Sequence, residues 1–579
     1  MTVSMAKWKL VLSALVALSA CVCYASVQCP SLQRNGTQGG CICRLKNYYT
    51  EVELYCENLG NVDSVPSLEE TNLVLELVTF RHSTVIRHIQ DDAFKRLIIK
   101  KLHLKNLDIS SISDNAFRGL DNTLEELYLQ SNLLRTVPTN ALKALSRLRY
   151  LGLDDNQIAE LGDNAFRNLA RLSLLYMANN NIARLSARTF AGLTSLSRIN
   201  LNGNRLSYLA PDVFSKTANL VELAVSDNRI TSIHRDAFGS LTRLERLYLS
   251  RNGIGDLEEG IFRANTDLLY LSVSGNNLTY LPNNLFGSST RLIQLDLSEN
   301  RITEIASLTF SWLPNLQVLR LNDNRIRNFD WSILDHQPSL RNIYLRSNRL
   351  GAITMQAKTI LTYLDLSQNE LSQLDNNWLG GVKVFSLDLS NNRINTVLSM
   401  AFRGSDSLNT LRLSYNNISR LMPEVFRDAF ALSSLYLDNN HLHSSDMRVI
   451  QNLPYLTTID ASHNQITYIV QDLFKRNQYL QTLDMSFNRL SRLRDKDFNG
   501  LEHLQYLYLH DNNIDITITH DFFTKVNQLH TIDLRSNKIK AVQKYALFGL
   551  NKLVHIDLSH NVLSYLSAGV YITRRRSDR

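Results

Sequence analysis

No cysteine follows Cys56 in this chain of 579 residues, so disulfide bonds can occur only near its N-terminus. The sequence also lacks a G-x-S-x-G elbow, an H-E-x-x-H motif, a phosphate-binding loop and a dinucleotide fingerprint. These absences argue against the common hydrolases, metalloproteases and nucleotide-dependent enzymes. We therefore expect no enzyme, no cofactor and no metal site.

Long apolar runs are absent beyond the first 25 residues. Lys7 and Lys9 precede an apolar run from Leu10 to Cys23, and Cys23-Tyr24-Ala25 has the small residues of a cleavage site. A membrane anchor is the alternative, but it needs about 20 apolar residues, so 1–25 is predicted to be a secretory signal. The final TRRRSDR does not resemble a lipid-anchor signal. We expect an extracellular protein without a membrane span in this chain.

The chain has too small an excess of positive charge to bind a nucleic acid. Its formal net charge of +8 falls to about +3 when the signal and the basic tail, residues 572–579, are set aside. This balance excludes a nucleic-acid interface. The stretch KRLIIKKLHLK, residues 95–105, is a local basic cluster, interpreted either as a solvated face or as a site for an acidic glycan or partner.

An even number of cysteines remains after signal removal, and they are clustered: Cys29, Cys41, Cys43 and Cys56. In a secreted chain this pattern predicts two disulfide bonds that staple a small cap, residues 26–58. Zinc is the alternative, but paired C-x2-C arms are missing and the compartment is oxidising.

From residue 59 to 571 the sequence repeats the unit L-x-x-L-x-L-x-x-N. Most steps between its asparagines are 24 residues, which predicts a solenoid of about 21 turns. Each unit supplies a short strand, and stacked units bury a shared core beneath a parallel sheet. The asparagines are Asn132, Asn156, Asn180, Asn204, Asn228, Asn252, Asn276, Asn300, Asn324, Asn348, Asn369, Asn392, Asn416, Asn440, Asn464, Asn488, Asn512, Asn537 and Asn561.

The repeated asparagine is predicted to be structural, because its amide offers a donor and an acceptor to backbone groups left unpaired where the chain turns out of the strand. Ten residues after most asparagines comes a phenylalanine, from Phe166 to Phe522. These rings are predicted to stack along the return path, which widens the back of the coil and makes the sheet concave.

The 24-residue unit with its phenylalanine resembles the typical extracellular leucine-rich-repeat class, which includes Toll-type receptor ectodomains, Slit, chaoptin and connectin. The resemblance implies an α/β, right-handed, curved coil, and it implies the cap disulfides Cys29–Cys43 and Cys41–Cys56. The family's C-terminal cysteine cap is missing here. We consider three explanations: a truncated chain, an end covered by a partner or second copy, or an end covered by the tail.

Function is expected on the concave face, where extended repeat proteins bind macromolecules. Two columns of outward strand positions are rich in tyrosine, which interfaces favour, although tyrosine is also a common exposed strand residue. The tyrosines are Tyr128, Tyr150, Tyr176, Tyr248, Tyr270, Tyr344, Tyr363, Tyr436, Tyr506 and Tyr508.

The central column becomes acidic in the later units, at Asp365, Asp388, Asp460, Asp484, Asp533 and Asp557. Neighbouring carboxylates repel, so this column indicates a basic partner or a cation. The alternative is that aspartate before a strand leucine belongs to the repeat's own consensus. His510, His555 and His560 lie nearby, and we interpret them as solvated side chains rather than as metal ligands.

Three N-x-[S/T] sequons predict glycans at Asn35, Asn277 and Asn417. Asn277 and Asn417 directly follow repeat asparagines, so their glycans would cover one flank of the coil and leave the concave face open.

We expect a secreted adhesion, matrix or receptor-type protein that binds a protein ligand, with a glycan as second candidate. Innate-immune recognition of a microbial ligand and escort of a secreted complex are the alternatives.

Overall fold

The computed structural model describes residues 40–46, 51–57, 74–81 and 86–566. In this part the chain is a parallel-strand solenoid of about 20 turns, and its helix is restricted to α2 (Thr139–Leu142), α3 (Ile333–His336) and the 3-10 helix η1 (Asp446–Asn452). The solenoid and parallel sheet predicted from the repeat are confirmed. The predicted signal, Asn35, Cys29 and the basic tail lie outside the described residues.

The chain divides into two compact units, the first ending at Ile254 but including Ile261–Leu268, and the second made of Gly255–Gly260 and the chain from Leu269 onward. In the first unit each repeat adds one strand to a large sheet, and all pairs after β1–β2 are parallel. The strands of this sheet are β1 (Gly40–Lys46), β2 (Glu51–Glu57), β3 (Val74–Arg81), β5 (Ile98–His103), β7 (Glu126–Tyr128), β8 (Tyr150–Gly152), β9 (Leu174–Tyr176), β10 (Arg198–Asn200), β12 (Glu222–Ala224) and β14 (Arg246–Tyr248). Two-residue strands form further pairs, β4 (His88–Ile89) with β6 (Ser111–Ile112) and β11 (Tyr208–Leu209) with β13 (Ser232–Ile233).

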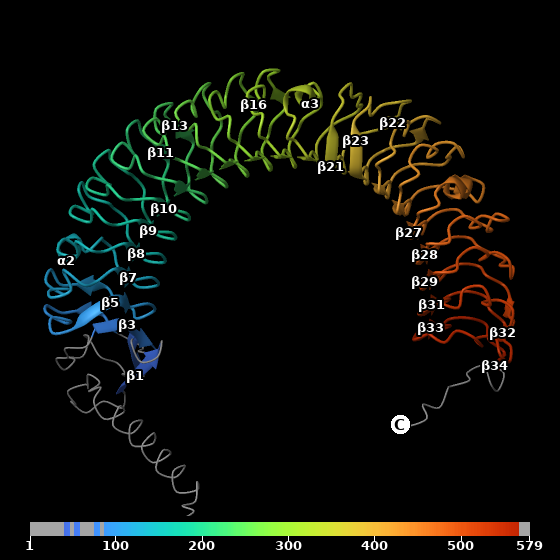
Figure 1. Ribbon diagram of the computed structural model, residues 1–579, viewed down its shortest axis with the longest axis horizontal. Helices are drawn as coiled ribbons and strands as arrows, with labels where there is room; N and C mark the ends of the chain where they lie inside the picture. The colour runs from blue at the N-terminus through green and yellow to red at the C-terminus, as the bar shows by residue number, and fades with distance from the viewer. Residues whose placement is uncertain (1–39, 47–50, 58–73, 82–85, 567–579) are drawn as a thin grey trace, which may run out of the picture. The chain divides into compact units, whose positions relative to one another are not determined.

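The second unit repeats this arrangement. Its large sheet contains β15 (Tyr270–Ser272), β17 (Gln294–Asp296), β19 (Val318–Arg320), β20 (Asn342–Tyr344), β21 (Ile360–Asp365), β23 (Lys383–Asp388), β25 (Thr410–Arg412), β26 (Ser434–Tyr436), β27 (Thr458–Asp460), β28 (Thr482–Asp484), β29 (Tyr506–Tyr508), β31 (Thr531–Asp533) and β33 (His555–Asp557). Its small sheets are β16 (Tyr280–Leu281) with β18 (Glu304–Ile305), β22 (Gln373–Leu374) with β24 (Thr396–Val397), and β30 (Thr517–Ile518), β32 (Ala541–Val542) and β34 (Tyr565–Leu566). Within each unit the large sheet lies on the inner side of the curve, and the small sheets lie on the outer side (Figure 1). We call the solvent-facing side of each large sheet its concave face.

The asparagine of each turn ties that turn to the one before it. Asn464 donates its amide to the carbonyl of Leu437 in the preceding turn at 2.9 Å, and its Oδ1 accepts the backbone N–H of Leu442 at 2.9 Å. It also donates to Ser462, in its own turn, at 2.9 Å. The side chain is 7 % exposed, so these backbone groups have no water as an alternative partner. The predicted structural role is confirmed.

The residue before each asparagine makes the turn out of the strand. His463, Phe487 and Asp511 have φ values of 50°, 51° and 53°, in the left-handed region that few side chains adopt. Glycine takes this position at Gly203, where φ is 66°. The sequence predicted a sharp turn here but not which residue carries it, because the position accepts many residue types.

The predicted phenylalanine stack is confirmed within both units. Phe166, Phe190 and Phe214 stack with ring centroids 6.4 and 6.0 Å apart, and all three are buried. In the second unit Phe286 and Phe310 stack at 6.1 Å. In three turns without the phenylalanine, Leu142, Leu334 and Ile450 occupy its place, and the chain forms α2, α3 and η1 there.

Strands β1 and β2 lie within the predicted N-terminal cap. β1 runs antiparallel to β2, and Cys41 lies directly opposite Cys56. Cys56 is buried and takes part in a disulfide bond. The side chains of Cys41 and Cys43 lie outside the described residues, so the pairing Cys41–Cys56 stays a prediction that this register favours.

We predict that Asn512→Ala lowers the free energy of unfolding by about 1 to 3 kcal/mol, because it leaves buried backbone groups such as the Met485 carbonyl, 2.9 Å from the Asn512 amide, without a partner. Asn513→Ala is the matched control, since the adjacent side chain is exposed. Urea unfolding followed by circular dichroism measures both. Equal effects of the two substitutions would contradict the structural role.

Candidate functional site

The register of the large sheets places the predicted tyrosines in columns. Tyr128, Gly152 and Tyr176 lie side by side in the central column, and Tyr150 lies in the neighbouring column beside Glu126 and Leu174. The tyrosines of the set are half-buried, except for Tyr506, which is 38 % exposed. They do not form one stripe, since the central column also carries other residue types between them.

Four rings of the first unit are in contact across consecutive strands. The ring centroids of His103 and Tyr128 are 4.1 Å apart, those of Tyr128 and Tyr150 4.3 Å, and those of Tyr150 and Tyr176 5.4 Å. We call His103, Tyr128, Tyr150 and Tyr176 the ring ladder. Such contacts stabilise the rings beyond the area they bury.

Gly152 leaves room for the Gln130 side chain, which contacts the ring ladder. A Cβ atom at this position would lie 2.0 Å from the Gln130 amide nitrogen. That amide donates to the Tyr150 hydroxyl at 2.9 Å, and the Tyr128 hydroxyl donates to Glu126 at 2.7 Å. The missing side chain therefore lets polar neighbours hold the rings in place.

Burial and charge around the ladder alter its titration. Burial, together with the Glu126 carboxylate, raises the pKa of Tyr128, and burial next to Asp154 raises the pKa of Tyr150 to about 12. The Lys105 ammonium lies 4.3 Å from the centroid of the Tyr128 ring, and burial lowers its pKa. The hydroxyls of Tyr128 and Tyr150 are thus neutral at physiological pH, and the Lys105 ammonium lies against the Tyr128 ring.

In the second unit, two tyrosines of the central column pair with arginines one turn earlier. The guanidinium of Arg320 lies 5.3 Å from the centroid of Tyr344, and that of Arg412 lies 4.1 Å from that of Tyr436. Tyr344 also contacts Tyr363 at 5.3 Å. The sequence reasoning placed Lys105 in a basic cluster, but it missed His103 and these arginines because it searched the columns for tyrosine and aspartate only.

The aspartates of the central column lie in register, as expected. Asp365 is opposite Asp388, Asp460 is opposite Asp484, and Asp533 is opposite Asp557. These carboxylates also serve the repeat itself. Asp484 accepts the backbone N–H of Ser486 at 2.9 Å and its hydroxyl at 2.6 Å, and Asp365 accepts from Ser367 in the same way. These hydrogen bonds favour the interpretation that aspartate belongs to the consensus of the repeat. They do not account for the negative charge that the carboxylates place on the concave face.

The pKa values of these aspartates differ because the aspartates are buried to different extents. It raises the pKa of Asp460 to about 6, and the nearby Asp484 and Asp438 carboxylates add to the effect. Burial likewise raises the pKa of Asp365. Hydrogen bonds from Ser559 lower the pKa of Asp557 instead.

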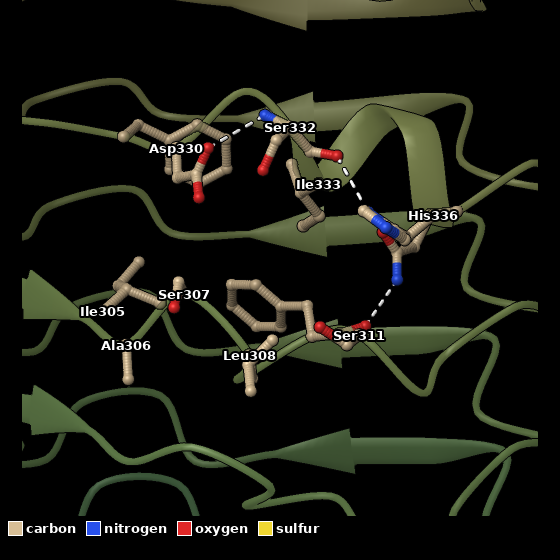
Figure 2. A pocket seen from close by; sticks show the side chains of 12 residues that line it. Ile305, Ala306, Ser307, Leu308, Ser311, Asp330, Ser332, Ile333 and His336 are labelled. Atoms are coloured by element: carbon tan, nitrogen blue, oxygen red, sulfur yellow. Dashed lines mark hydrogen bonds between the residues drawn. The ribbon is translucent and has the colours of Figure 1, made fainter.

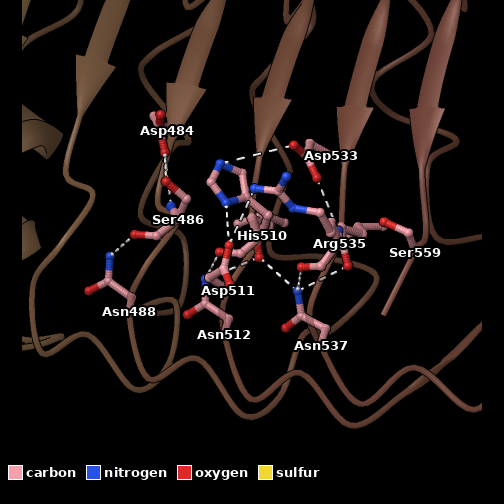
Figure 3. A network of polar contacts seen from close by, with 12 residues as sticks. Asp484, Ser486, Asn488, His510, Asp511, Asn512, Asp533, Arg535, Asn537 and Ser559 are labelled. Carbon is pink, nitrogen blue, oxygen red and sulfur yellow. Dashed lines mark hydrogen bonds and ion pairs between the residues drawn. The ribbon is translucent and has the colours of Figure 1, made fainter. Parts of the chain in front are cut away.

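Figure 3 shows the polar network of the late turns, where His510 lies between two carboxylates. Its Nδ1 is 2.9 Å from Asp511 and its Nε2 is 4.0 Å from Asp533. Arg535 reaches Asp511 at 3.5 Å. Among the described residues no group of three or more His, Cys, Asp or Glu side chains could hold a metal ion.

Phe487 is an exposed aromatic residue that the sequence reasoning missed. Its ring stacks on His463 with centroids 4.1 Å apart and meets the edge of His510 at 5.1 Å. Phe487 occupies the left-handed position before Asn488, and it is 41 % exposed. A bulky aromatic residue where most turns carry small or polar ones was the available signal.

Two of the three predicted glycan sites, Asn277 and Asn417, lie within the described residues, directly after repeat asparagines. Asn417 is exposed, and its backbone N–H donates to Ile394 at 2.9 Å. Asn277 is half-buried. Modification of either stays a prediction.

The leucine-rich-repeat family model matches residues 98–158, 146–206, 196–254, 242–302, 290–350, 383–442, 454–514 and 517–570. The chain therefore belongs to the leucine-rich-repeat family. No curated protein sequence matches it.

Solved structures share the fold at low sequence identity. The Toll–Spatzle complex of Drosophila is 18 % identical with a TM-score of 0.54, over 94 % of each chain. The plant peptide hormone receptor RGFR1 in complex with RGF2 is 18 % identical with a TM-score of 0.53, over 86 % of this chain and 82 % of that one. YopM from Yersinia enterocolitica is 22 % identical with a TM-score of 0.51, over 89 % and 88 %. At these identities the likeness shows the fold alone.

We predict that Asp460→Asn stabilises the chain at pH 7.5 by about 1 kcal/mol, after allowance for solvent screening. The folded-state pKa of about 6 lies above the ordinary 3.8, so the charged form is penalised above pH 6 and the penalty disappears as the pH falls towards 4. Urea midpoints at pH 7.5 and pH 4 measure the difference. Asp557→Asn is the control, since its lowered pKa predicts no stabilisation at pH 7.5.

Proposed function

We propose that the chain is an extracellular binding protein that recognises a protein ligand through its concave faces. The observation that carries this proposal is the ring ladder of the first unit. Its aromatic side chains are held by one another and by polar neighbours before any ligand arrives, so binding need not order them. Fixed aromatic side chains of this kind supply much of the energy of protein interfaces.

The charges on the concave face of the second unit support a ligand with basic groups. Asp438, Asp460 and Asp484 lie near one another, and the described residues provide no ion pair for any of the three. Tyr508 borders Asp484 in the same column. A lysine or arginine side chain would relieve this repulsion and contact the ring as well.

Several known structures of this fold support binding rather than catalysis. The Toll and RGFR1 structures were solved as complexes with Spatzle and with the peptide RGF2. None of the helices among the described residues has the length and apolar character needed to cross a membrane. We propose residues 1–25 as the signal, 26–58 as a disulfide-bonded cap, 59–571 as the repeat region and 572–579 as a basic tail.

Within this proposal, an adhesion, matrix or receptor role is the main hypothesis. Immune recognition and escort of a secreted complex are its alternatives, and a glycan or a second copy of the chain is an alternative ligand. Clustering of cells that display the chain supports adhesion. Retention on microbial surfaces supports immune recognition, and stoichiometric co-purification from body fluid supports escort.

We predict that a ligand found by screening the chain against an array of extracellular domains binds Tyr150→Ala/Tyr176→Ala at least tenfold more weakly, because the substitutions remove two rings of the ladder. Tyr208→Ala is the matched control, since Tyr208 is 45 % exposed on the small sheet β11–β13. Surface plasmon resonance measures the affinities. A ligand that responds equally to both variants would contradict the proposed face.

A further inference from the structure

The stack of phenylalanines is interrupted in the second unit at α3. Phe286 stacks on Phe310 at 6.1 Å, but the position that would carry the next ring is occupied by Leu334 in the helix. The aromatic residues of this turn are Phe329 and Trp331, which pack edge-on with ring centroids 4.8 Å apart. The turn therefore fills the core differently from a regular repeat.

A pocket of about 170 Å³ lies at this interruption. Figure 2 shows its two edges, with Ile305 to Ser311 of one turn along one side and Asp330 to His336 of the next turn along the other. Phe310, Phe329 and Ile333 line its buried part together with the polar side chain of Gln337, and Leu308, 55 % exposed, lines its mouth. A cavity of about 150 Å³ lined by apolar residues is large enough to bind benzene, so this pocket accommodates one aromatic ring.

The mouth of the pocket carries hydrogen-bond acceptors. The Asp330 carboxylate accepts the backbone N–H of Ser332 at 3.0 Å, and no cation among the described residues pairs with it. The His336 ring donates through Nδ1 to the Ser332 carbonyl at 3.1 Å, which leaves Nε2 as an acceptor in the neutral ring. A ligand must therefore bring its own donors to this edge, and a positive charge would be favoured by Asp330.

We propose that this pocket binds an aromatic ring joined by a short aliphatic link to an ammonium group, the chemistry of an arylalkylamine. The ring takes the apolar space beside Phe310 and Phe329, and the ammonium donates to the Asp330 carboxylate at the mouth. The same chemistry occurs in a free amine and in the N-terminal phenylalanine or tyrosine of a peptide. The site lies on turns outside the concave face, so it is independent of the function proposed above.

Phenethylamine, phenethyl alcohol and phenylacetate test the proposal on the full chain, because they share the ring and differ in the polar group. We expect phenethylamine to bind at least tenfold more tightly than the alcohol, and phenylacetate to bind most weakly. Saturation-transfer NMR detects contact, and isothermal titration gives the affinities. Absence of binding at millimolar concentration, or phenylacetate binding as tightly as the amine, would overturn the proposal.

Two variants assign the binding to this pocket. Asp330→Asn should remove the tenfold preference for the amine, whereas Asp335→Asn should keep it, since Asp335 is exposed on α3 but does not line the pocket. Ile333→Phe should fill the space and abolish binding of all three probes, with circular dichroism confirming that the variant folds. Unchanged binding in Ile333→Phe or in Asp330→Asn would overturn the assignment.

A peptide beginning with phenylalanine distinguishes the two sources of the ligand. Phe-Gly-Gly-amide carries the ring and the ammonium with the same spacing as phenethylamine. Tighter binding of the peptide identifies a protein terminus, and tighter binding of the amine identifies a free small molecule. The N-acetylated peptide should not bind, and its binding as tightly as the free peptide would contradict the role of the ammonium.

Discussion

The fold depends on one interaction, the hydrogen bonds that a buried asparagine amide makes to the turn before it. A strand of three residues followed by a sharp turn leaves backbone donors and acceptors that no neighbouring strand can reach. Asn488 meets this need from both sides, since it donates to Ala461 at 2.9 Å and accepts from Ile466 at 3.0 Å. Because the turns from Asn132 onward repeat the arrangement, the outward strand positions are free to vary without loss of the fold. Those free positions form the concave faces.

The parts of the structure that recur were predictable from the sequence. An asparagine that must bond the same buried groups in each turn recurs at the same position of the repeat. A phenylalanine that must fill the same space recurs in the same way. The positions of Asn464 and Phe190 could therefore be derived from spacing alone. The in-register aspartates also followed, because each of them holds the same place relative to the repeat asparagine, which keeps equivalent strand positions side by side.

The features that depend on particular combinations of residues could not be derived in this way. The contact of Tyr128 with Tyr150 crosses two columns, and the Gln130 side chain that bonds to Tyr150 lies against a glycine, residue 152, which no repeat pattern signals. The pairing of Arg412 with Tyr436 depends on two residues of different type one turn apart. The pocket at α3 arises where the repeat omits its phenylalanine, and the pattern predicts only the omission, not the space that results. The periodicity of the sequence was thus sufficient to predict the solenoid. The candidate sites arise at residues that depart from the repeat, so they could not be predicted from it.

The late aspartates show why a consensus role does not account for their charge. Asp484 accepts from the backbone two residues later, but the same bond is made without charge at Asn200, whose Oδ1 accepts the N–H of Asn202 at 3.0 Å in the same column of the first unit. An amide therefore satisfies the turn as well as a carboxylate does. The carboxylate of Asp460 is costly, because burial opposes its ionisation and Asp484 repels it. The unfavourable burial of this charge therefore supports the acidic face that we propose for a basic ligand.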